Sequence, residues 1–353
     1  TVVTGWIVKY LIDTATGRFS GLGSQEVADA FAATTSDTAI CVGFTILVVI
    51  IGFIVCMSSL QKGLERISKY MMGLMLVILI SLAAYCITLP GAGEGLSFYL
   101  IPDFERLMDA GLFKVIVAAL SQAFFTLSLG IGSMAIFGSY LDKNRSLMGE
   151  SVNVIILDTF VAVTAGLIIF PACFTYDLEV GAGPGLLFDT MATVFNNMKA
   201  GRLWGSIFFL FMVFASMSTV LAVFENILAC VRELTGWSRI KGAIICGIVL
   251  FLTSTTTALG GSLLSGFQPF GPESGVLDLW DFIVSNNLLP IGSLIFVIFC
   301  TFKRFGFGWK KFMAEANSGK GLKVRNWMMP FFCIIPPIAI IVVYITGLID
   351  KFK

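Results

Sequence analysis

The sequence predicts an all-α, polytopic membrane protein, and three observations lead to that fold class. Hydrophobic residues make up 57% of the 353 residues, charged residues only 13%, and the mean hydropathy is +0.92. Soluble domains rarely combine these values. Apolar runs of about 20 residues recur along the chain, which is the length a helix needs to cross a bilayer. Basic residues are concentrated in every second connector between these runs.

Residues 1–353 are therefore predicted to form a single transmembrane domain. The apolar run 1–12 is too short to cross a bilayer and is predicted as part of a helix, and residues 13–38 are predicted as a polar loop. The predicted complete spans are about 39–60, 70–89, 115–141, 152–174, 203–230, 242–261, 279–301 and 327–349. In the connector before the third of these spans, Pro102-Asp103 is predicted to start a short helix. The connector 175–202 is rich in glycine and is predicted as a loop.

The charges of the connectors predict the orientation in the membrane. One set is rich in Lys and Arg and comprises 61–69, 142–150, 232–241 and 303–325. The alternate set is acidic or nearly neutral and comprises 13–38, 90–113, 175–202 and 262–278. The positive-inside rule assigns the basic set to the cytoplasm. We expect a multi-pass protein of the cell inner (plasma) membrane, with the lipid bilayer as its surroundings.

The composition excludes several classes of function. A net charge of +1 gives no reason to expect nucleic acid as a partner, and the chain has no histidine. Ser-His and Cys-His mechanisms are therefore impossible. Eight cysteines stand singly in apolar runs without C-x-x-C spacing, so no metal cluster or redox pair is predicted. An intramembrane enzyme would need paired acids or a nucleophile activated by a base. The sequence shows neither, so the protein is predicted not to be an enzyme.

The stretch Gln122–Gly132 lies inside the apolar segment 115–141 and contains Thr126, Ser128, Gly130 and Gly132. Glycines weaken a helix, and hydroxyls compete for its backbone hydrogen bonds. Lipid cannot satisfy the backbone groups that a break would expose, so a broken helix must line a cavity and coordinate a ligand. Close packing of small residues between unbroken helices accounts for the same composition, and both interpretations stay open.

A second helix carries small and hydroxyl-bearing residues on one face. Ala215, Ser218, Thr219 and Ala222 follow the i, i+3, i+4, i+7 spacing of a helix. Such a face suits close helix packing, and it equally suits a hard cation that is coordinated by oxygen atoms.

Asp158 and Glu225 are carboxyl groups inside otherwise apolar segments. Charges at membrane depth usually face a cavity or a partner. Because no Lys or Arg stands at matching depth, the two acids suggest a cation pathway. The alternative is that both lie near helix ends and reach water.

Motifs along the whole chain resemble the neurotransmitter:sodium symporter family, and in particular its bacterial LeuT-type amino-acid transporters. They occur in the family's order and spacing and are Thr4-Gly-Trp6, Gly63–Lys69, Gly95–Phe98, Pro102–Arg106, Gln122–Gly132, Phe170-Pro171, Phe214–Thr219 and Asp278–Phe282. The resemblance implies the inverted-repeat LeuT-type fold, here lacking the first two and a half helices. The segment 115–141 would be the family's broken sixth helix.

The resemblance also implies the function, which is sodium-coupled symport of small, apolar amino acids by alternating access. The alternative is a truncated, non-transporting remnant of such a transporter. Two Na⁺ sites are expected in a full-length protein, and the expected partners are an amino acid and sodium ions.

Site residues are carried over from the family where the motifs match. Substrate contacts are implied for Phe125 (an aromatic lid), Thr126, Ser128, Ile131 and Val223. Sodium ligands are implied for Thr126 and Asp158 at the first site, and for Ala215 (through its carbonyl), Ser218 and Thr219 at the second. Gln122 matches a position beside the family's chloride site, together with Asp158, and Asp281 matches the acidic half of the outer gate.

Two departures from the family pattern lead to further expectations. Asp158 stands where many relatives have Asn, and Ala162 stands where relatives have a chloride-binding serine or an acid. We expect Asp158 to supply the fixed negative charge, so that chloride is not required. In its fifth helix the family often has a glycine, nine further residues and then a proline. In this chain Gly73 stands at the proline's position after Gly63, which puts the unwinding of that helix in doubt.

Overall fold

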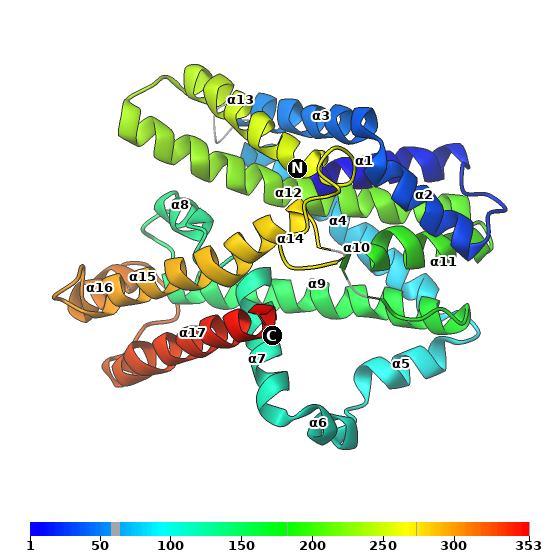
Figure 1. Ribbon diagram of the computed structural model, residues 1–353. Coiled ribbons are helices and arrows are strands. Elements are labelled where there is room, and N and C mark those ends of the chain that lie inside the picture. Colours follow the sequence, from blue (N-terminus) through cyan, green and yellow to red (C-terminus); the bar gives the residue numbers. More distant parts are fainter. Residues whose placement is uncertain (58–63, 182, 273, 353) are drawn as a thin grey trace. The chain divides into compact units, whose positions relative to one another are not determined.

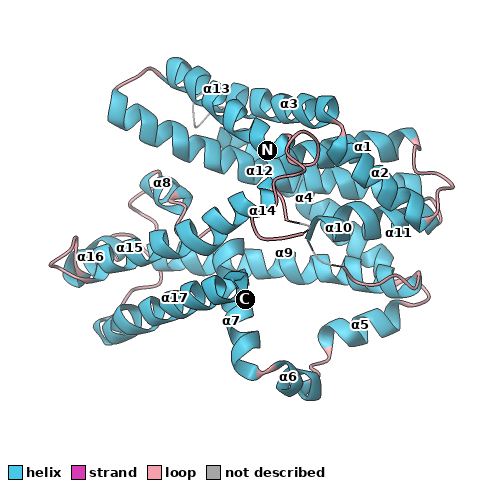
Figure 2. Cartoon of the chain, viewed as in Figure 1, coloured by secondary structure: helices cyan, strands magenta, loops and turns pink. Residues whose placement is uncertain are grey.

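The computed structural model describes residues 1–57, 64–181, 183–272 and 274–352. Within these ranges the regular secondary structure is helical, apart from two isolated bridges, as Figure 2 shows. The predicted all-α class is confirmed. Seven helical stretches in these ranges are long and apolar enough to cross a membrane: Thr38–Met57, Arg66–Ile87, Leu147–Thr175, Gly201–Thr235, Arg239–Ala258, Val276–Thr301 and Asn326–Ile349.

The remaining predicted span, 115–141, is divided between two shorter helices. The first is α7 (Leu112–Thr126) and the second is α8 (Ser133–Ser139). The chain also bends by 93° between α6 (Phe104–Ala110) and α7. Asp103 is the N-cap of α6 because its carboxylate accepts a hydrogen bond from the backbone N–H of Arg106 at 3.0 Å. The short helix predicted at Pro102-Asp103 is confirmed.

The chain forms two compact units. Unit 1 comprises residues 1–102 and 161–267, and unit 2 comprises residues 103–160 and 268–353. The long helix α9 (Leu147–Thr175) contributes to both.

In unit 1, α1 (Val2–Thr16) packs against α3 (Thr38–Met57) and α12 (Gly201–Thr235). α12 also packs against α4 (Leu64–Ile87), and α13 (Arg239–Ala258) against α3. The predicted span 39–60 lies on α3 as far as Met57, and its last three residues fall outside the described ranges. The predicted span 70–89 lies on α4 as far as Ile87. Close approach of α3 and α12 depends on Gly52, where a Cβ atom would lie 2.6 Å from the ring of Phe224.

The predicted loop 13–38 is wrong over much of its length, because α2 (Ser24–Ser36) occupies it. Val27 is fully buried, and the ring of Phe31, one turn on, stacks on Phe188 with 4.8 Å between centroids. The helix begins where the Glu26 carboxylate accepts the backbone N–H of Gly23 at 2.7 Å. Val27 and Phe31 are its large apolar side chains. The Ala, Ser and Thr residues around them obscure the helical hydrophobic periodicity in the sequence.

The glycine-rich connector 175–202 is not a plain loop either. It contains a single turn α10 (Gly183–Gly185), a π-helical turn (Leu186–Thr190) and α11 (Met191–Asn197). Met191 and Val194 of α11 are fully buried, so this connector contributes to the core of unit 1. The connector 90–114 likewise contains α5 (Ala92–Leu100) besides α6.

In unit 2, α7 packs against α15 (Leu289–Thr301) and α17 (Met329–Phe352), and these two helices pack against each other. In Figure 1 they are the orange and red helices. α15 continues a span that starts with α14 (Val276–Asp281) and passes through a π-helical stretch, Phe282–Leu288. The basic connector 303–325 contains α16 (Trp309–Ala316).

Candidate functional site

The helix break predicted in the stretch Gln122–Gly132 is present. α7 ends at Thr126 and α8 begins at Ser133. Between them Ser128, Gly130 and Gly132 have φ values of 50°, 87° and 90°. A left-handed conformation costs a non-glycine residue about 1–2 kcal/mol, so the strain at Ser128 must be offset by the surroundings of the break.

The end of α7 brings two of the expected sodium ligands together. The hydroxyl of Thr126 donates to Oδ1 of Asp158 at 3.0 Å. Asp158 lies on α9 and its side chain is half-buried. A carboxylate and a hydroxyl beside the open end of a helix form a cluster of oxygen atoms with one fixed negative charge.

The unwound stretch is held against α15 by direct backbone packing. A Cβ atom on Gly130 would overlap the carbonyl of Leu289 and lie 2.8 Å from the backbone nitrogen of Ser293. A Cβ atom on Gly292 would overlap the carbonyl of Gly130. Gly292 and Ser293 are not among the predicted site residues. The small pair Gly292-Ser293 inside the apolar span 279–301 was the available signal.

A cavity of about 280 Å³ opens beside the break, within unit 2. Its lining includes Ser128, Gly130, Gly132 and Ser293, and the remaining walls are mostly apolar. The Ser293 hydroxyl is buried and has no hydrogen-bond partner among the described residues. The break therefore presents polar groups to an otherwise apolar space.

A second cavity of unit 2, of about 430 Å³, gathers three predicted site residues. Gln122, Phe125 and Asp281 all line it. Asp281 is exposed and accepts a hydrogen bond from the Ser285 hydroxyl at 2.7 Å. The amide, the aromatic ring and the acidic residue lie on α7 and at the end of α14, on one side of the break.

The other group of predicted sodium ligands lies in unit 1. On α12 the Ala215 carbonyl accepts hydrogen bonds from the hydroxyls of Ser218, at 2.7 Å, and Thr219, at 3.4 Å. The three oxygens converge within one turn, although α12 is unbroken there. Val223 is half-buried one turn further along α12, and Ile131 is half-buried in the broken stretch of unit 2.

The expectation that Glu225 has no basic partner is wrong. Its carboxylate is 1% exposed and receives two hydrogen bonds from the guanidinium of Arg239, at 3.1 and 2.6 Å. The Nε of Arg239 also donates to the carbonyl of Cys56 at 2.6 Å. Arg239 is the first residue of α13. The chain reverses direction after α12, and this brings Arg239 beside Glu225. Glu225 is thus half of a buried ion pair.

The glycine pair of the family's fifth helix can be followed only in part. Gly63 lies outside the described residues. Gly73 lies in the uninterrupted helix α4, and a Cβ atom added to it would meet nothing within 4 Å outside its own helical turn.

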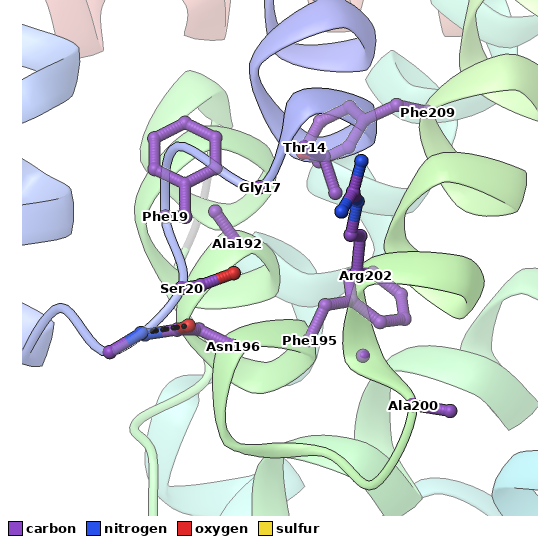
Figure 3. Close-up of a pocket in the computed structure, with 12 residues that line it drawn as sticks. Thr14, Gly17, Phe19, Ser20, Ala192, Phe195, Asn196, Ala200, Arg202 and Phe209 are labelled. Carbon is purple, nitrogen blue, oxygen red and sulfur yellow. Dashed lines mark hydrogen bonds between the residues drawn. The ribbon is translucent and has the colours of Figure 1, made fainter.

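A further cavity of unit 1, of about 250 Å³, contains none of the predicted site residues (Figure 3). It lies between the end of α1 and the start of α12, beside α11. The Nε of Arg202 donates to the carbonyl of Ala15 at 2.7 Å, and Asn196 accepts the backbone N–H of Gly21 at 3.3 Å. These bonds hold the end of α1 and the segment after it against α11 and the start of α12, so the polar groups here stabilise the fold.

Comparisons with known proteins identify relatives of this chain in sequence and in fold. The model of the sodium:neurotransmitter symporter family matches residues 35–353. The chain is 31% identical to the uncharacterized sodium-dependent transporter YhdH of Bacillus subtilis (strain 168), over 98% of this chain and 75% of that protein. It is 30% identical to an uncharacterized sodium-dependent transporter of Haemophilus influenzae, over 98% of this chain and 75% of that protein. The crystal structure of MhsT in complex with L-phenylalanine superposes with a TM-score of 0.84 at 33% identity, covering 98% of this chain and 77% of that one.

Proposed function

The chain belongs to the sodium:neurotransmitter symporter family, and from that premise we propose that it couples sodium entry to the uptake of small, apolar amino acids by alternating access. Its fold is the LeuT fold, its relatives are sodium-dependent transporters, and the family consists of transporters rather than enzymes. It is a multi-pass membrane protein.

The break between Thr126 and Ser133, with Asp158 hydrogen-bonded to its edge, is the observation that carries the proposal. A dehydrated Na⁺ needs several oxygen ligands. The Thr126 hydroxyl, the Asp158 carboxylate and the carbonyls released by the break are the oxygens this chain offers at the first sodium site. The carboxylate compensates the charge of the ion where the dielectric is low.

A second sodium site is proposed at Ala215, Ser218 and Thr219. Their three oxygens converge on one turn of α12. They are uncharged, and a site built from neutral oxygens has to be completed by ligands from outside this turn.

The substrate is proposed to lie against the unwound stretch. Ser128 would contact it, Phe125 would cover it, and Ile131 would face its side chain. The structure of MhsT holds L-phenylalanine, which agrees with an apolar substrate. Asp281, in the same cavity as Phe125, would be the acidic half of an outer gate.

Chloride is proposed to be unnecessary. Asp158 supplies a fixed negative charge beside Thr126, and Ala162, one turn along α9, has no hydroxyl with which to bind an anion. Gln122, the amide beside the family's chloride site, lies in the cavity with Phe125.

Coupling follows from mutual stabilisation of the two solutes. A zwitterion whose carboxylate lies next to Na⁺ binds more tightly when the ion is present, and the ion binds more tightly by the same factor. The sodium gradient and a membrane potential worth about 2.3 kcal/mol per charge per 100 mV then drive uptake.

The test is uptake by purified protein in liposomes. Radiolabelled phenylalanine and leucine should accumulate with an inward Na⁺ gradient and not with an equal K⁺ gradient. Thr126→Val, which removes one proposed ligand oxygen at similar volume, should raise the Na⁺ concentration for half-maximal uptake. Thr16→Val, at an exposed hydroxyl of α1, should not. Folded protein that shows no Na⁺-driven uptake and no Na⁺-dependent binding of either amino acid would disprove the proposal.

A further inference from the structure

The connector between α15 and the last span carries a large positive charge. Residues 302–325 contain seven Lys and Arg residues and one acid, Glu315. α15 ends at Thr301 and the last span begins at Asn326, so both ends of the connector lie at a membrane surface. The alternation of charge assigns this surface to the cytoplasmic side, where the lipid leaflet is anionic.

The first part of this connector presents cations and aromatic rings together. We define the 303–311 surface by its exposed side chains, Lys303, Arg304, Phe305, Phe307, Lys310 and Lys311. The Phe305 side chain is 67% exposed. The ammonium group of Lys311 lies 5.8 Å from the ring centroid of Phe307, and the Arg304 guanidinium lies 6.0 Å from that of Phe305. Each pair therefore presents a charge beside an apolar face.

The backbone beneath the 303–311 surface is held in one conformation. Gly308 has a φ of 78°, and its N–H donates to the carbonyl of Phe299 at 3.3 Å. The rings of Phe299 and Phe307 lie parallel at 6.4 Å. Trp309 is buried and packs with Phe312 and Phe332, which anchors α16 beyond the end of α15 (Figure 1). The surface is thus preorganised for a ligand.

The four cations of this surface have no carboxylate within ion-pair distance among the described residues. Uncompensated cations beside exposed aromatic rings are the composition that settles at the boundary between headgroups and acyl chains. We propose that the 303–311 surface binds the headgroups of anionic phospholipids in the cytoplasmic leaflet, with Phe305 and Phe307 entering the acyl boundary.

Lipid bound to the 303–311 surface would also restrain the backbone at the start of α9. The backbone N–H of Lys320 donates to the carbonyl of Asn144 at 2.9 Å, and the Ser146 hydroxyl donates to the carbonyl of Leu322. These bonds join the connector that carries α16 to the connector between α8 and α9. A lipid that fixes the first connector restrains the second, which follows the inner half of the broken helix.

The test measures lipid binding and not transport, so its outcome is independent of the proposed substrate. The full chain is purified in a neutral detergent and titrated with phosphatidylglycerol or phosphatidylcholine, and bound lipids are counted by native mass spectrometry. We expect tight binding of phosphatidylglycerol only. Lys310→Gln/Lys311→Gln should weaken it roughly 30-fold, because each surface cation contributes a factor of about five. Amide exchange in 303–311 and 143–147 should slow when phosphatidylglycerol is present.

The matched control is Arg66→Gln/Lys69→Gln, which removes two exposed cations from the cytoplasmic end of α4. It should bind phosphatidylglycerol at this site as the wild type does. Melting curves in detergent alone show whether each variant is folded. The proposal is overturned if the Lys310/Lys311 variant retains wild-type affinity, if the control loses as much, or if glycerol 3-phosphate displaces the lipid at similar concentration.

Discussion

At the scale of single residues, Asp158 decides how the proposed first sodium site is charged. Its carboxylate accepts the Thr126 hydroxyl at 3.0 Å. Asp158→Asn keeps the shape and removes the charge. We expect the initial rate of uptake to fall at least tenfold in chloride-free medium and to be partly restored by chloride. Asp109→Asn, at an exposed acid of the same unit, should change neither rate. A variant as fast as the wild type without chloride contradicts this role.

We expect Asp189 to make the stability of unit 1 depend on pH. Burial raises the pKa of its carboxyl, and Oδ1 has no hydrogen-bond partner among the described residues. Because the folded chain holds the proton more tightly than the unfolded chain, Asp189 contributes stability below its ordinary pKa. That contribution is lost as the pH rises through the raised pKa.

Asp189→Asn should therefore raise the melting temperature at pH 7 and have little effect at pH 4. The measurement is thermal unfolding in detergent across that range. Glu179→Gln, at an exposed acid of the same connector, should leave the pH dependence as it is in the wild type. An Asn variant with the wild-type slope would show that Asp189 is not the titrating group.

The buried pair Glu225–Arg239 supports the join between α12 and α13. Arg239→Gln removes the guanidinium from a carboxylate that is 1% exposed, and breaking a buried ion pair in this way destabilises by about 3–5 kcal/mol. The double variant Glu225→Gln/Arg239→Gln removes both charges and should regain much of that stability. Thermal unfolding of the wild type, the single variant and the double variant measures both effects. Equal melting temperatures for the single Arg239 variant and the wild type would contradict the expected loss.

At the scale of elements, the contact of the broken stretch with α15 depends on two glycines. Gly292→Ala would drive a methyl group into the carbonyl of Gly130. We expect uptake to fall at least tenfold, because the break can no longer lie on α15. Gly138→Ala on α8 is the control, since nothing lies within 4 Å of its added Cβ atom. It should be neutral or slightly stabilising, because Ala favours a helix more than Gly does. Normal transport by Gly292→Ala would mean that the contact is dispensable.

The sequence predicted elements where one signal was strong enough by itself. Uninterrupted apolar length identified the membrane helices, and Thr126 to Gly132 marked the break. α2 was missed because Val27 and Phe31 are its only large apolar side chains, and they stand among Ala, Ser and Thr residues. The pairing of Glu225 with Arg239 was missed because it depends on how the chain folds back after α12. The contact of Gly130 with Gly292 joins residues 162 positions apart, and no local pattern reports it.

At the scale of the whole molecule, the alternation of charge among the connectors fixes which ends of the spans share a side of the membrane. Cysteine scanning checks that assignment. Cys230 is the one exposed cysteine among the described residues, so Cys230→Ser should lower the background labelling by a maleimide. In intact cells, Asp29→Cys and Asp109→Cys should react with a membrane-impermeant maleimide. Lys143→Cys and Lys310→Cys should react only after the membrane is opened, because their connectors are basic. Labelling of Lys310→Cys from outside would show that the orientation is the reverse of the one assigned. The 303–311 surface would then face the outside and could not bind lipids of the cytoplasmic leaflet.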